Sequence, residues 1–154
     1  MKSNFTYSTD FYGINSHALT YCCVHLICLE GEGSFVFNGK AFRMFKNDIL
    51  VTSTPCKIKN LAAPESAVFE WFAAPNSFLG GLLPANNYSI GGSISLNANP
   101  IIPLSDADAE QFLADIHRIR ERIDKTDSHF YDGIMGSLCL IMIYDIFEFH
   151  AKYY

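Results

Sequence analysis

Residues 29–55, LEGEGSFVFNGKAFRMFKNDILVTSTP, have the pattern of one compact β unit. Residues 30–33 contain two glycines, which adopt the positive φ angles that tight turns need. Asn38-Gly39 is the strongest short hairpin signal that a sequence offers, because both residues tolerate the backbone of a two-residue turn. The unit therefore contains three predicted strands, at residues 34–37, 41–45 and 49–52.

Further strands are expected on both sides of this unit, at residues 20–29, 56–61 and 67–72. Residues 20–29 carry β-branched, aromatic and thiol side chains on both faces, which is typical of a strand buried on both sides. Short strands at such close spacing indicate an antiparallel barrel or jelly roll. Residues 75–103 are interrupted repeatedly by Gly, Pro and Asn, so loops with one short helix and one more strand are expected there.

Two helices are predicted at the C-terminal end. Ser105 followed by Asp108 approximates a capping box at the start of the first helix. Its apolar residues recur at helical spacing and form one stripe, namely Phe112, Leu113, Ile116, Ile119 and Ile123. Residues 126–128 break this helix, and the second helix covers about 129–152.

The second helix is apolar nearly all round, so nearly all of its surface must be covered. A small barrel cannot cover it alone, and we therefore expect a second copy of the chain to pack on one side. The predicted dimer stripe is Leu138, Ile141, Met142, Asp145 and Phe149. The opposite stripe would then face the barrel or the first helix, with Leu140, Ile143 and Phe147, although the two stripes could exchange roles.

Composition narrows the class of protein. The chain has 154 residues, of which 49% are hydrophobic and 13 are Phe, enough for one domain with an ordinary core. Its net charge is −5 and it has no basic run, so this chain alone should not bind nucleic acid. The five cysteines form no CxxC pair and are read as reduced thiols. Without a signal peptide or an uninterrupted apolar span, the protein is expected to be cytoplasmic, with no membrane partner.

The order glycine turn, strand, Asn-Gly, strand, Asp-terminated turn, apolar strand and proline resembles the core of the cupin family. It is most similar to the N-terminal sensor domains of AraC-type transcription regulators. The likeness extends over an aromatic arm at 1–12, a barrel at 13–103 and, after NPIIPLSDADAEQF, two helices within 104–154. The resemblance implies a single structural domain, a cupin-type antiparallel jelly-roll barrel followed by two α-helices.

The resemblance also implies a function. In that family a small molecule, often a sugar, occupies the barrel, the arm can close over it, and the last helices pair two subunits. A separate C-terminal module of two helix-turn-helix units binds DNA, and no such module follows the second helix in these 154 residues. The expected partners are thus an effector, a second copy of the chain, and DNA only through that absent module.

This sequence lacks the metal-ligand residues that cupin enzymes usually have. Those enzymes usually hold a divalent metal with two histidines and a glutamate before the glycine turn and one histidine after the later proline. Here residues 22–24 are Cys-Cys-Val, Ile58 stands at the downstream position, and His17 and His25 do not form an HxH pair. No other catalytic motif occurs. We therefore expect no metal, no cofactor and no enzymatic activity.

The sequence offers several candidate ligand-binding residues. Trp71, the only tryptophan, shares a strand face with Phe69, and its flat ring suits a sugar ring or a planar ligand, although it could equally fill the core. His25 lies in an otherwise apolar strand, which favours a hydrogen-bonded core or pocket histidine over a catalytic base. The remaining candidates are Tyr21 and Cys23 on the His25 face, Arg43, and Tyr7 and Tyr12 as lid residues on the arm.

Three hypotheses follow. The first is a ligand-sensing, dimerising module that transmits occupancy to a DNA-binding domain. The second is a stand-alone metal-dependent cupin enzyme, an isomerase or dioxygenase, which needs metal ligands. The third is an assembly domain whose barrel is too full for a ligand, since 13 Phe could fill a small barrel. A cavity beside Trp71 would argue against the third.

Overall fold

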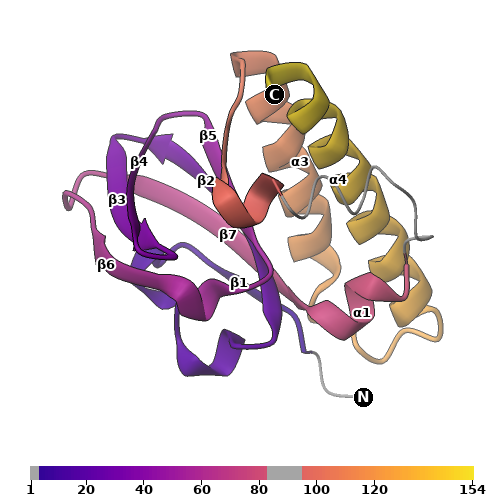
Figure 1. Cartoon of the computed structure of the whole chain (residues 1–154). Helices are drawn as coiled ribbons and strands as arrows, with labels where there is room; N and C mark the ends of the chain where they lie inside the picture. The colour runs from indigo at the N-terminus through magenta and orange to yellow at the C-terminus, as the bar shows by residue number, and fades with distance from the viewer. Residues whose placement is uncertain (1–3, 83–94) are drawn as a thin grey trace.

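The chain forms three layers, with a three-stranded sheet on one side, a five-stranded sheet in the middle and two long helices on the other side (Figure 1). This computed structural model describes residues 4–82 and 95–154. All strand pairs in the described part of both sheets are antiparallel. The prediction of a mainly β protein with C-terminal helices is therefore confirmed.

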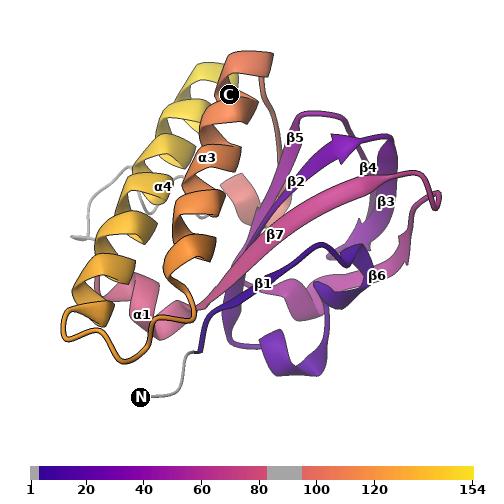
Figure 2. The same cartoon turned by 180° about the vertical axis from the view of Figure 1, so that it is seen from behind.

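The five-stranded sheet is built around its longest strand. In spatial order it contains β1 (Thr6–Ser8), β7 (Val68–Pro75), β2 (Cys22–Glu30), β5 (Asp48–Thr52) and β8 (Ile101–Pro103). The three-stranded sheet contains β4 (Lys40–Phe45), β3 (Glu32–Phe37) and β6 (Ile58–Ala62). The predicted arm is part of the first sheet, because β1 pairs with the edge of β7, as the view from behind shows (Figure 2).

The hairpin at the centre of the sequence forms as predicted. Asn38 and Gly39 have φ angles of 54° and 81°, the left-handed values of a two-residue hairpin turn between β3 and β4. The preceding glycine turn is shorter than predicted, because only Gly31 has a positive φ and β3 already begins at Glu32. Gly33 is needed for another reason, since a Cβ there would lie 3.0 Å from the rings of Phe11 and Phe69.

The strand predicted at 56–61 begins later than expected. A short 3-10 turn, Pro55–Lys57, comes first, because Pro lacks the N–H that a ladder needs and is suited to the first helical position. The described part of the segment 75–103 contains the expected strand, β8 (Ile101–Pro103), but two helical stretches in place of the one expected: α1 (Asn76–Gly80) and a single turn at 95–98. The part of that prediction that covers 83–94 lies outside the described residues.

The two faces of the five-stranded sheet bury separate cores. Its inner face, toward the three-stranded sheet, carries Leu26, Leu50 and Trp71, which pack with Phe35 and Phe37 of β3. Its helix face carries alternate residues of the same strands, which pack with the two helices. Both faces of the sheet are therefore buried from solvent. This explains why apolar side chains predominate on both faces of β2.

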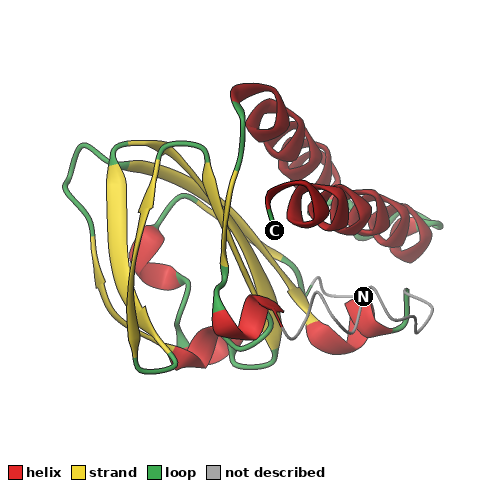
Figure 3. Cartoon of the chain, turned by 45° about the horizontal axis from the view of Figure 1, so that its top comes forward, coloured by secondary structure: helices red, strands yellow, loops and turns green. Residues whose placement is uncertain are grey.

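The helices α3 (Asp106–Arg122) and α4 (Tyr131–Tyr153) lie side by side against the helix face (Figure 3). Ser105 caps α3 as predicted, with its Oγ accepting a hydrogen bond from the Asp108 amide at 3.2 Å. Most of the predicted apolar stripe of α3 is buried, at Phe112, Ile116, Ile119 and Ile123, while Leu113 is half-buried.

Helix α4 has one buried and one exposed side. Met142 and Phe149 are buried in the chain's own core, so the prediction that these two residues contact a second subunit is wrong. Sequence periodicity could not assign the stripes because both are apolar. The exposed side carries Ile141 and Tyr144, which keep 49% and 46% of their surface exposed. Half-buried Leu138 and Asp145 flank it.

By length and composition, α4 is apolar enough to span a membrane. It is the only such helix in the described part of the chain, and 39% of its most apolar window is buried against the rest of the protein. A core helix of a soluble protein passes the same test. A single helix of this kind is weak evidence for a membrane span and is consistent with a soluble protein.

Candidate functional site

A cavity of about 300 Å³ lies between the helix face of the five-stranded sheet and the helices α1 and α4. Strands β2 and β5 form its floor, and Ile143, Ile146 and Phe147 of α4 form one wall. We call this space the helix-face cavity. Its other lining residues are Cys23, His25, Val51, Thr52, Ser53, Asn76, Leu79, Gly80, Leu96 and Asn97.

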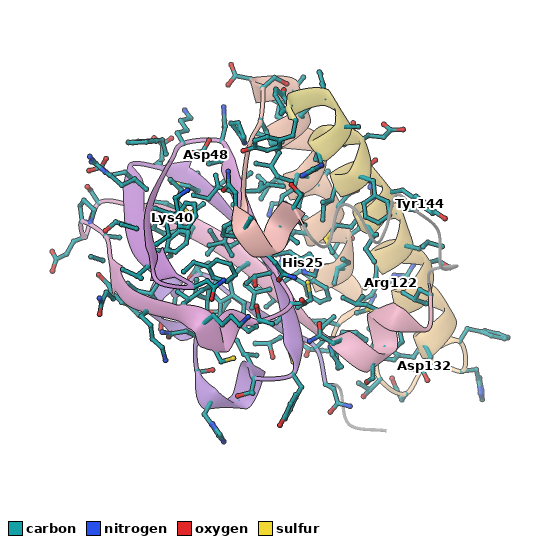
Figure 4. All side chains as sticks on the ribbon, viewed as in Figure 1. His25, Lys40, Asp48, Arg122, Asp132 and Tyr144 are labelled. Atoms are coloured by element: carbon teal, nitrogen blue, oxygen red, sulfur yellow. The ribbon has the colours of Figure 1, made fainter. Side chains whose placement is uncertain are left out.

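His25 is the most informative residue of this cavity, and Figure 4 shows it between the sheets and the helices. Its ring is 1% exposed and stacks near Phe72, with centroids 5.8 Å apart. Its Nδ1 lies 3.2 Å from the Phe72 carbonyl oxygen, which can only accept, so Nδ1 carries the proton and donates. The other ring nitrogen, Nε2, is then a hydrogen-bond acceptor.

Burial lowers the pKa of His25 to about 4, because the charged imidazolium loses its hydration in the protein interior. The backbone hydrogen bond to Phe72 raises this pKa and only partly offsets burial. The ring is therefore neutral near pH 7. The buried ring and its hydrogen bond agree with the interpretation of His25 as a hydrogen-bonded core or pocket histidine.

The other polar groups of the helix-face cavity are neutral as well. The Cys23 Sγ lies 3.5 Å from His25 Nε2, and burial raises the pKa of this thiol to about 12, so it stays protonated. Thr52 Oγ1 accepts a hydrogen bond from the Thr54 amide at 3.0 Å. Asn76 donates through its side-chain nitrogen to the Ser53 carbonyl at 2.9 Å. These bonds hold the cavity wall in place and leave it uncharged.

Trp71 and Phe69 do not line this cavity. Both are 3% exposed and lie on the inner face of the sheet, in the core between the two sheets. The Phe69 ring stacks on Phe11 with centroids 4.2 Å apart, and Trp71 Nε1 donates to the Asp10 carbonyl at 2.8 Å. Two of the predicted ligand-binding residues thus serve as packing residues, separated from His25 by the thickness of the sheet.

Tyr12 and Arg43 line a different hollow, on the surface of the three-stranded sheet, with a volume of about 420 Å³. Arg43 Nη2 donates to the Glu32 carboxylate at 2.7 Å, and its side chain is 63% exposed. The Tyr12 hydroxyl bonds to the backbone of Ala63. Although its volume is larger, only Gly33 among the eight described residues that line this hollow is buried, whereas seven of the thirteen that line the helix-face cavity are buried. We therefore regard the latter as the candidate site.

Tyr21 and Tyr7 lie outside both spaces. Tyr21 precedes β2 and is 83% exposed, so it does not continue the face of Cys23 and His25. The Tyr7 hydroxyl donates to the Glu70 carboxylate, which also lies 2.8 Å from His117 Nε2 on α3. Arg120 of α3 donates to the Tyr7 hydroxyl at 3.3 Å. Tyr7 thus ties the arm to the sheet and to α3.

Among residues 4–82 and 95–154, no group of three or more His, Cys, Asp or Glu side chains is placed to hold a metal ion. All five cysteines are free, with Cys56 exposed and Cys22 half-buried. Cys23 and Cys139 are buried, and burial raises the pKa of each thiol to about 12, so neither is a ready nucleophile.

No protein-family model matches this chain, and no curated protein matches it significantly. The residues of the candidate site are therefore assigned from geometry alone.

Sequence reasoning missed most of the helix-face cavity. Ile143 was assigned to a packing stripe, and Thr52, Asn76 and Ile146 were not singled out. Asn76 opens α1 directly after β7, a place where polar residues commonly serve as turn formers, so nothing in the sequence distinguishes it. The signal that pointed to this cavity was His25 in an otherwise apolar strand, with Cys23 on the same face.

Proposed function

We propose that this chain is the effector-sensing and dimerisation domain of a transcription regulator of the AraC type. It binds a small molecule and relays occupancy to a helix-turn-helix domain elsewhere in the regulator. Its fold would be a cupin-type jelly roll. The family assignment is supported by the residue pattern of 29–55 and by the order of arm, two antiparallel sheets and two helices.

The helix-face cavity carries the proposal. It has the size of small-molecule sites, which start near 300 Å³. It is bounded by β2 and β5 on one side and by α4 on the other, so a single ligand touches both the sheet and the helix. A ligand that binds one position of α4 more tightly than another shifts the population between them. The site therefore differs from the barrel interior that the family resemblance implied.

The exposed side of α4 supplies the proposed dimer contact. Ile141 and Tyr144 are large, half-exposed and one helical turn apart, and Leu138 lies a further turn away. This stripe replaces the one predicted from sequence, retaining Ile141 and Leu138 and excluding the buried Met142 and Phe149. It lies on the same helix as Ile143 and Ile146, which line the cavity, so a ligand and a second subunit act on one helix.

A thermal-shift screen of neutral and charged metabolites, with and without chelator, tests the sensing function. A ligand of this site raises the melting temperature as its concentration rises. Ile143→Trp should fill the cavity and abolish the shift, while Tyr12→Phe, in the surface hollow, should preserve it. A shift that survives Ile143→Trp would place the ligand elsewhere and refute this site.

Sedimentation equilibrium tests the dimer. Ile141→Lys should produce monomers at concentrations where the unmodified chain is dimeric, because a buried unpaired charge opposes association. Glu121→Lys places the same side chain on the exposed side of α3 and should leave the dimer intact. Equal behaviour of the two variants would refute a contact at Ile141.

A second function, an assembly domain that binds no ligand, is favoured by one observation. The space between the sheets is filled by rings, including Phe35, Phe37, Phe69 and Trp71, all at most 3% exposed. Neither Trp71 nor Phe69 lines any of three cavities found among the described residues. If no metabolite stabilises the chain while Ile141→Lys breaks the dimer, this second function is the better account.

A further inference from the structure

The helix-face cavity limits the kind of molecule that it can hold. None of its thirteen described lining residues is Asp, Glu, Lys or Arg. A charged ligand would lose its hydration there and find no opposite charge in return. Phosphorylated compounds, carboxylates and amino acids are therefore disfavoured, although the chain as a whole carries many charges.

The lining also disfavours sugars. Most of the wall surface is apolar, and six of the thirteen described lining residues are Val51, Leu79, Leu96, Ile143, Ile146 and Phe147. The side chains of Thr52 and Asn76 already make hydrogen bonds within the protein, to Thr54 and Ser53. A sugar carries hydroxyl groups around its whole rim, and each one that is buried against such a wall without a partner costs free energy. A ligand with one polar edge and an apolar body matches this lining better.

The polar edge of the ligand is set by His25. Its Nδ1 proton is engaged by the Phe72 carbonyl, which leaves Nε2 as an acceptor beside the cavity. The nearest described donor to Nε2 is the Cys23 thiol at 3.5 Å, and a thiol is a weak donor. Because burial keeps the ring neutral, an N–H or O–H group of a ligand can replace this contact with a stronger one.

Size limits the body of the ligand. A volume of about 300 Å³ is twice that of a cavity known to hold benzene, which is about 150 Å³. This volume is therefore suited to a compound of about two fused rings.

We propose that the helix-face cavity binds an uncharged, mainly apolar ring compound that donates one hydrogen bond to Nε2 of His25. This inference rests on the proposed sensing function and adds the chemical class of the effector.

The proposed chemical class of the ligand is tested by measuring the binding of four compounds to the full chain by calorimetry. Indole has two fused rings and one N–H donor, and benzofuran has the same shape without the donor. Indole-3-acetate adds a charge, and arabinose is a neutral sugar. Indole should bind about tenfold more tightly than benzofuran, the effect of about one buried hydrogen bond. The acetate and the sugar should bind more weakly than both.

Nitrogen-15 NMR of the His25 ring provides a direct readout of the hydrogen bond. Indole should move the Nε2 resonance and leave Nδ1 nearly unchanged, whereas benzofuran should move Nε2 much less. His25→Phe keeps a ring but removes the acceptor, so it should make the two affinities equal. Tyr12→Phe is the control and should preserve the tenfold difference. If His25→Phe does not fold, the Nε2 resonance of the unmodified chain still shows whether indole donates a hydrogen bond to His25.

The possible failures are distinguishable. Equal binding of indole and benzofuran, or an unmoved Nε2 resonance, overturns the role of His25. Tighter binding of arabinose or indole-3-acetate, lost in Ile143→Trp, overturns the chemical class and still supports a sensor at this site. If none of the four compounds binds, the proposed chemical class of the effector is overturned. The thermal-shift screen of metabolites then tests separately whether the chain binds any effector.

Discussion

Strand β2 contributes Leu26 to the core between the sheets and His25 to the core beneath the helices, although the two residues are neighbours in sequence. The inner side of the five-stranded sheet is packed with aromatic rings, and within residues 4–82 and 95–154 it contains no buried His, Asp, Glu, Lys or Arg. The helix side contains the cavity, His25 and, on α3, the buried Asp115. The first side thus supports the fold, and the second has the groups that can respond to a ligand or a proton.

Phe69→Ala should give the largest effect, because it tests the packing of the inner side. Phe69 is 3% exposed and stacks on Phe11, so truncation leaves a cavity between the sheets. The free energy of unfolding, measured by urea denaturation, should fall by about 3–5 kcal/mol. Phe45→Ala removes a half-exposed ring from β4 and should cost less than about 1 kcal/mol. Similar losses for both variants would show that the inner side is not tightly packed.

Much of this arrangement could be predicted from sequence because it follows from local signals. The Asn38-Gly39 hairpin, the Ser105 cap and the antiparallel strands depend on turn chemistry and short-range periodicity. Strand alternation also grouped Cys23 with His25, and Phe69 with Trp71, on common faces. Each pair does share a face in the structure.

The position of the site could not be predicted from the same signals. Both faces of β2 are buried, so hydropathy does not say which face meets the helices and which meets the other sheet. The ligand-binding candidates were therefore combined from opposite faces. The same ambiguity affected α4, where Met142 and Ile141 are adjacent apolar residues but only Ile141 is exposed. These choices depend on tertiary packing.

The pH dependence of stability should separate the helix side from the inner side. His25 has a pKa of about 4 when folded and an ordinary value near 6.5 when unfolded. Between these values only the unfolded chain holds the proton, so stability is lost as the pH falls from about 6.5 to 4. The loss due to His25 should be about 3 kcal/mol. The difference in unfolding free energy between the unmodified chain and His25→Phe, measured across this range, should show that slope, and parallel curves would contradict it.

Asp115 of α3 should have the opposite effect on the pH dependence of stability. Asp115 is 3% exposed, Arg118 donates to its Oδ1 at 3.0 Å, and the Asp145 carboxyl of α4 lies within hydrogen-bond reach of a protonated Asp115. Burial, and then the neighbouring Asp145 carboxylate of α4, raise the pKa of Asp115 to about 8, more than Arg118 lowers it. From about pH 4 to 8 the folded chain holds a proton that the unfolded chain has lost, so this group makes stability fall as the pH rises.

Asp115→Asn removes that titration while keeping the shape of the side chain. The variant should be more stable than the unmodified chain by more than about 2 kcal/mol at pH 8, because an uncharged amide replaces a carboxyl that is costly to ionise. Near pH 4 the folded unmodified chain carries a protonated, uncharged Asp115, and the amide of the Asp115→Asn variant is uncharged as well. The two proteins should therefore unfold at similar denaturant concentrations. Denaturation curves at the two pH values provide the measurement. A variant that is less stable at both values would mean that the Arg118 contact outweighs burial, and that the helix side has one proton-sensitive group, His25, instead of two.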